Sequence, residues 1–128
     1  MAFLTIPGFS KMSKQRMFNK AVAHIAITRV QSYTSDSGCR YSGTGCNAAP
    51  LLQEVYRHQA DTYGPWHELV EMCLVPKNNA IFIGELQTAH DTCDHNMGEA
   101  FVAQWKENMA ALAKRWNLST STLDKVPA

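Results

Sequence analysis

The stretch NMGEAFVAQWKENMAALAKRWN, residues 96–117, carries the most regular hydrophobic pattern of the chain. Its apolar side chains recur at intervals of three and four residues, which places them on one face of an α-helix. Asn96 and Glu99 have the spacing of a capping box, and Asn117 suits the left-handed position that ends a helix. The sequence therefore predicts a long amphipathic helix with a buried stripe of Phe101, Val102, Trp105, Met109, Leu112 and Trp116.

Four further helices are predicted upstream of this stretch. Ser13 is a suitable N-cap for a helix that would end near Gln31. Pro50 fits the first turn of a helix over residues 47–59, where its missing N–H has no cost. Two more helices are expected at residues 66–74 and 79–91.

Residues 38–46 indicate a small β-hairpin between the first two helices. Gly43 and Gly45 permit positive φ angles in its turn. Short arms would then bring Cys39 and Cys46 close together, and the sequence leaves open whether these thiols are paired, metal-bound or free.

The expected fold is mainly α, with four or five helices and this one hairpin, in a single α+β domain. A chain of 128 residues with 45% hydrophobic residues is long enough for one core. The domain would span residues 1–128, with its core at about 12–118 and a loose tail at 119–128. No apolar run is long enough to cross a membrane and no signal peptide is evident, so a cytoplasmic location is expected.

The formal net charge of +1 hides an asymmetry along the chain. Residues 1–40 contain six basic side chains and one acidic side chain, whereas residues 61–99 contain seven acidic side chains and Lys77. The two regions either pair with each other or attract partners of opposite charge. A nucleic-acid partner stays open as an alternative, although a strongly basic domain would favour it more.

Three segments together resemble a known group of proteins. They are residues 14–24, KQRMFNKAVAH; residues 39–52, CRYSGTGCNAAPLL; and residues 86–91, LQTAHD. In this order they are similar to small uncharacterised proteins of bacteriophages, prophages and mobile gene cassettes, which pair an FNxVxxH helix with a CxYRG…C hairpin and an LQxxHD helix. Ser42 departs from the pattern, because an arginine is common there. The resemblance implies a fold and a mobile-element origin but no activity.

The cysteines and histidines allow one candidate metal site. Cys39, Cys46, His90 and Cys93 could form a tetrahedral Cys₃His zinc site that joins the hairpin to a helix. The six residues between the first two cysteines exceed the usual spacing of structural zinc ligands. Without zinc, the histidine and the cysteines would pack in the core, and no cofactor is expected.

The leading functional hypothesis is a non-catalytic accessory protein that binds a protein partner or its own copy. The candidate binding residues are Tyr41, Trp66, Gln87, His90 and Asp91. The first alternative is a small metal- or ligand-binding domain at the candidate zinc site. A hydrolase with His90 as base and Cys39 or Cys46 as nucleophile comes third, because no known catalytic fingerprint is present.

Overall fold

The fold, described by a computed structural model, is built mainly from helices. The structure describes residues 3–34 and 38–127, and of residues 33, 34, 38 and 39 the backbone alone. Within these ranges the α-helices are α1 (Lys14–Thr28), α2 (Arg57–Asp61), α3 (Trp66–Glu71), α4 (Ala80–Asp91), α5 (Gly98–Trp116) and α6 (Ser121–Asp124). Three 3₁₀ turns are η1 (Phe9–Lys11), η2 (Ala49–Leu51) and η3 (Glu54–Tyr56).

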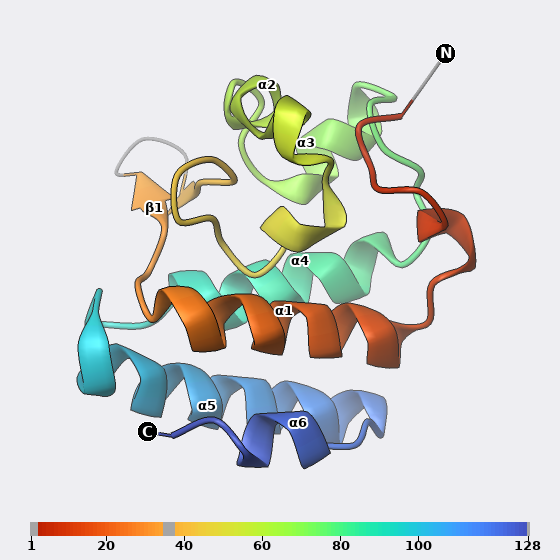
Figure 1. The fold of residues 1–128 in the computed structure, drawn as a ribbon. Coiled ribbons are helices and arrows are strands. Elements are labelled where there is room, and N and C mark those ends of the chain that lie inside the picture. Colours follow the sequence, from red (N-terminus) through yellow and green to blue (C-terminus); the bar gives the residue numbers. More distant parts are fainter. Residues whose placement is uncertain (1–2, 35–37, 128) are drawn as a thin grey trace.

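The axes of the three long helices α1, α4 and α5 are roughly aligned, and the helices lie side by side (Figure 1). The first turns of α1 and α4 lie at the same end as the last turn of α5, because α5 runs antiparallel to the other two. The shorter elements η2, η3, α2 and α3 lie on the side of α1 and α4 away from α5, where η2 contacts α1 and α3 contacts α4 (Figure 1). The layer of long helices therefore supports an irregular layer made from residues 40–76.

Local sequence explains where α1 and α5 begin and end. Ser13 Oγ accepts a hydrogen bond from the Arg16 amide, as the N-cap prediction requires. The helix ends at Thr28, earlier than predicted, because Arg29 adopts a left-handed conformation with φ 52°. Asn117 takes the left-handed position after α5, as predicted, and the Leu118 amide bonds the Ala113 carbonyl at 2.8 Å.

The buried apolar side chains form one cluster. It includes the apolar stripes of α1, α4 and α5 and extends to Leu4 and Phe9 near the N-terminus. Leu123 and Val126 are also buried, since α6 packs against α1 and α5. The Gln15 side chain bonds both the amide and the carbonyl of Ser119, at 2.7 and 3.1 Å. The predicted loose tail is therefore wrong for the part of it that the structure describes.

The predicted α+β fold class with a hairpin at residues 38–46 is wrong, and the molecule is an all-α protein. Residues 40–48 form consecutive turns without a strand. Two two-residue segments at the start of this region and before it, β1 (Tyr33–Thr34) and β2 (Gly38–Cys39), pair antiparallel. Gly43 and Gly45 do take positive φ angles. The turns at these glycines direct the chain into the core, where Cys46 is fully buried.

The predicted helix over residues 47–59 is also wrong. Leu52 and Gln53 have extended backbone, with ψ of 147° and 132°, and separate η2 from η3. Leu52 pairs with Thr5 in an isolated antiparallel bridge. The capping box predicted at Asn96 is absent as well, because Met97 is the N-cap of α5 and makes no side-chain cap bond.

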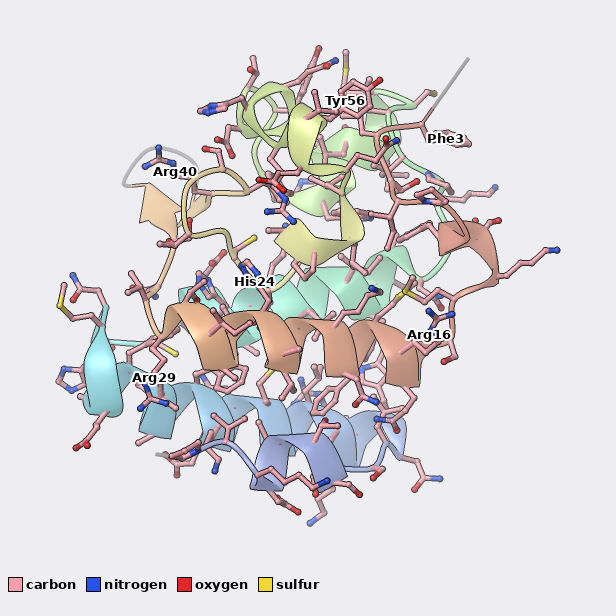
Figure 2. All side chains as sticks on the ribbon, viewed as in Figure 1. Phe3, Arg16, His24, Arg29, Arg40 and Tyr56 are labelled. Atoms are coloured by element: carbon pink, nitrogen blue, oxygen red, sulfur yellow. The ribbon has the colours of Figure 1, made fainter. Side chains whose placement is uncertain are left out.

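Pairing between the basic N-terminal region and the acidic central region, one of the two alternatives that the sequence leaves open, does not occur among the described side chains. The salt bridges found there join His67 with Glu68, His90 with Asp91, and Arg115 with Glu85. Figure 2 shows Arg16 and Arg29 near the two ends of α1. Within residues 3–34 and 38–127, no helix combines the length and the apolar character that crossing a bilayer requires.

Candidate functional site: the loop of residues 40–48

Residues 40–48, called the central loop here, are fixed by buried polar side chains from several elements. The first is Tyr41, which is fully buried against α4. Gln87 donates from Nε2 to the Tyr41 hydroxyl at 2.7 Å, and its Oε1 accepts from the Trp66 amide at 2.9 Å. Burial raises the pKa of the Tyr41 phenol, so its hydroxyl stays protonated. Three predicted binding residues thus meet, but inside the core.

His90 occupies a second buried position beneath the central loop. Its Nε2 accepts a hydrogen bond from the Ser32 amide at 3.0 Å. A nitrogen that accepts carries no proton, so the proton lies on Nδ1, which donates to Asp91 at 2.7 Å. Adjacent helical residues point in different directions, yet these two side chains do meet. Both imidazole nitrogens are therefore engaged inside the protein.

Asp61 holds the start of the central loop from α2. Its Oδ1 accepts from the Tyr41 amide at 2.7 Å and from the Ser42 amide at 3.4 Å. The Ser42 hydroxyl donates to the other carboxylate oxygen and accepts from Arg40 Nε. The Ser42 hydroxyl thus connects the Asp61 carboxylate with the Arg40 guanidinium.

His24 of α1 holds the middle of the central loop. Its Nε2–H donates to the Gly45 carbonyl at 3.0 Å, and Figure 2 shows His24 directed from α1 toward this loop. Partial burial lowers the pKa of the imidazole, against the opposing effect of its backbone hydrogen bonds. A Cβ on Gly45 would lie 2.8 Å from Ala49 Cβ and 2.9 Å from His24 Nε2. Only glycine allows this close approach.

Asn47 anchors the end of the central loop between α4 and α5. Its Nδ2 donates to the Leu86 carbonyl at 2.7 Å, and its Oδ1 accepts from the Trp105 indole at 3.0 Å. Sequence analysis missed Asn47 together with Ser32, Ser42 and Asp61. A signal was present for Asn47 alone, since it is the one polar side chain in the otherwise apolar run of residues 46–52.

The candidate zinc ligands do not form a metal centre in the part of the chain that the structure describes. Cys46 is disulfide-bonded there, so its sulfur is not a free thiolate. Cys93 is a buried free thiol, and burial raises its pKa to about 11. No group of three or more His, Cys, Asp or Glu side chains is placed to hold a metal within residues 3–34 and 38–127. The Cys39 side chain lies outside the described residues.

Above this network the central loop presents a small cleft to solvent. The cleft has a volume of about 160 Å³ and is lined by Ser42, Gly43, Glu54, Arg57 and His58. Arg57 donates from Nε to the Ala49 carbonyl, which fixes its side chain against the loop. The cleft therefore combines a guanidinium, an imidazole and a carboxylate on a backbone that is held from below.

Comparison with known proteins identifies no relative. The chain matches no family model, no curated protein and no solved structure. The similarity to phage and mobile-element proteins consequently stays a prediction from sequence motifs.

Proposed function

We propose that the protein is a non-catalytic accessory protein, of phage or mobile-element type, that binds a protein partner through the surface of residues 40–44 and 54–58. The phage-type part of this proposal rests on the motif resemblance alone. The observation that supports the binding role is the network of buried side chains beneath the central loop. Such a network holds a surface loop in one conformation before a partner arrives, which lowers the entropic cost of binding.

The same network favours binding over catalysis. Groups suited to acid–base chemistry are already engaged in internal bonds: His90 with Ser32 and Asp91, and Asp61 with the loop amides. Tyr41 and His90 are fully buried. These side chains support the loop and do not face a substrate.

The character of the surface favours a protein partner over a nucleic acid. Glu54 lies in the cleft beside Arg57, and a carboxylate there would repel a phosphate backbone. Val55, on the same 3₁₀ turn, is 77% exposed. Arginine is enriched at protein interfaces, and an exposed apolar side chain beside it provides surface that a partner can bury.

Affinity capture by the full chain from a lysate of the source cells, with paired variants, tests this proposal. Val55→Asp and Arg40→Glu should lose the protein captured by the wild type. Ile27→Asp and Lys125→Glu make the same chemical changes at exposed positions elsewhere and should retain it. The proposal would be contradicted if Val55→Asp and Arg40→Glu still captured the same protein, or if nuclease treatment abolished capture by the wild type. A native mass that includes one zinc ion per chain would support the metal-binding alternative instead.

We further propose a cytoplasmic location, which the oxidation state of the cysteines tests directly. Disulfides are rare in the cytosol because thiol reductants keep cysteines reduced. The chain has four cysteines, of which Cys73 and Cys93 are free thiols in the structure. Alkylation of denatured protein from acid-quenched cells should modify all four cysteines if the protein is cytoplasmic. Modification of Cys73 and Cys93 alone would place it in an oxidising compartment.

A further inference from the structure

One end of the molecule carries a groove that is both apolar and basic. Two shallow depressions of about 540 and 470 Å³ lie on either side of Lys77 and share it as a lining residue. Their walls combine apolar side chains with cations, and among the described residues no acidic side chain lines either depression. We call this feature the basic groove; the lining residues that matter here are Phe3, Lys14, Lys77, Ile81 and Trp116.

The apolar side chains of the basic groove are unusually accessible. Ile81 is 76% exposed and Phe3 is 44% exposed. Lys14 Nζ lies 5.4 Å from the centre of the Trp116 ring, so a cation and an aromatic surface stand together. A ligand that fits here needs an apolar side chain flanked by negative charge.

The opposite end of the molecule presents that combination. Residues 94–99, called the acidic loop, are all exposed and comprise the end of the connection between α4 and α5 and the first two residues of α5. Met97 is 63% exposed and lies between Asp94 and Glu99 in the sequence. The nearby cation, Arg29, donates to the Pro127 carbonyl at 2.9 Å.

The acidic loop is held in position although its residues are exposed. The backbone N–H of Gln31 donates to the Asn96 carbonyl at 2.8 Å, and the backbone N–H of Gly98 donates to the Arg29 carbonyl at 3.0 Å. Gln104 bonds both the amide and the carboxylate of Asp94. Because the loop is already ordered, docking it costs little conformational entropy.

The two surfaces cannot meet within one molecule. Trp116 ends α5 and the acidic loop precedes it, so the two lie at opposite ends of that helix (Figure 1). Nineteen helical residues span about 28 Å at 1.5 Å per residue. Contact between the acidic loop and the basic groove therefore requires a second copy of the chain.

We propose that the acidic loop of one copy docks in the basic groove of the next, with Met97 against the apolar walls and Asp94 and Glu99 facing Lys14 and Lys77. A methionine suits this position because its flexible thioether adapts to irregular apolar and aromatic surfaces. The two docking surfaces differ, so the contact is head-to-tail and builds open chains or closed rings rather than a two-fold dimer. This proposal uses other residues than the loop surface of the proposed function and stands or falls independently of it.

Sedimentation velocity over a concentration series tests the proposal. At low salt the average mass should rise above the 14.3 kDa of one chain as the concentration increases. Because the interface is small and its charges are exposed, the association affinity should fall about tenfold or more when the salt rises from 50 mM to 500 mM. A wild-type chain that stays monomeric to millimolar concentration at low salt would overturn the proposal.

Paired charge reversals separate this arrangement from other modes of association. Lys77→Glu disables the groove and Glu99→Lys disables the loop, so each variant alone should weaken association about tenfold or more. A mixture of the two should associate again, because the reversed loop fits the reversed groove and the unchanged loop fits the unchanged groove. Lys125→Glu and Ile27→Asp should associate as the wild type does.

A third variant guards against an effect on folding. Met97→Asp changes an exposed side chain, and the melting curve of each variant should stay within about 3 °C of the wild type. Association that survives Met97→Asp, or that only one of the two charge reversals removes, would contradict head-to-tail docking.

Discussion

The pair of helices α4 and α5 and the central loop of residues 40–48 are both buried on their inner sides, but different forces hold them. The helices contact each other through apolar side chains such as Leu86 and Leu112. The loop has few backbone bonds of its own and is fixed by Asp61, His24, Gln87 and Asn47.

This difference has a consequence for specificity. Apolar packing tolerates exchange of one hydrophobic side chain for another of similar volume. A polar network does not, because removing one partner leaves another buried group without a hydrogen bond. The helices should therefore determine how stable the protein is, and the network should determine where the loop lies.

The largest effect is expected from a cavity between the helices. Leu112 is fully buried in α5, and Leu112→Ala should lower the free energy of unfolding by about 4 kcal/mol through lost burial and the cavity. Urea unfolding followed by circular dichroism measures this change. Ala110→Ser, at an exposed position of the same helix, should change it by less than about 0.5 kcal/mol. Similar losses in both variants would mean that the helix pair is not the main source of stability.

A methyl group in the central loop should have the next largest effect. Gly45 has φ +79°, and an added Cβ would lie 3.1 Å from the Tyr41 carbonyl as well as close to His24 and Ala49. Gly45→Ala should cost about 3 kcal/mol, from left-handed strain and overpacking together.

Gly43→Ala is the matched control for this substitution. Gly43 also has a positive φ, +68°, but the nearest atoms to an added Cβ are 3.9 Å away in the Arg40 side chain. It should cost about 1 kcal/mol from strain alone. Equal costs in chemical denaturation would show that the close approach at Gly45 does not constrain the loop.

Removing the side-chain amide of Gln87 should lower the free energy of unfolding by less, but it should act more locally. Gln87→Leu leaves the Tyr41 hydroxyl and the Trp66 amide without this partner, for about 2 kcal/mol. Hydrogen exchange should accelerate at the Cys46 amide, which bonds the Arg40 carbonyl at 2.9 Å, before it does in α5. Thr88→Ala, an exposed change on the same helix, should leave this exchange rate unaltered. Uniform acceleration throughout the protein would contradict a local role.

The smallest effect is expected from pH. The pKa of His24 is lower in the folded protein than its ordinary value of 6.5 because burial disfavours the charged imidazole. Below pH 6.5 the unfolded chain therefore binds more protons than the folded one, and stability falls as the pH decreases toward the folded pKa. Urea unfolding at pH 8 and pH 5 should show a larger loss for the wild type than for His24→Gln. His58→Gln, at an exposed position, should lose as much as the wild type.

The sequence predicts the helices of the packed layer well because their determinants are local. Ser13 caps α1, and the three- and four-residue spacing from Phe101 to Leu112 requires one buried helical face. Asn117 ends α5 as its left-handed preference predicts. Each of these features depends on residues within a few positions of one another.

The central loop and its surroundings could not be predicted in the same way, because their determinants are distant in the sequence. Leu51 and Leu52 are both buried although they are adjacent, and Leu52 pairs with Thr5 in an extended conformation. No helical pattern contains that information. The candidate binding residues Tyr41, Trp66 and Gln87 do come together, but as supports beneath the surface, since burial also depends on tertiary packing.

The contact between Gln15 and Ser119 also bears on how the protein is made. These two residues are 104 positions apart, so at 5–20 residues per second Gln15 leaves the ribosome about 5–20 s before Ser119 does. During this interval the apolar face of α1 lacks part of its final cover. Native structure should thus form late in synthesis, and the nascent chain should depend on a holding chaperone more than a protein of this size with local contacts would.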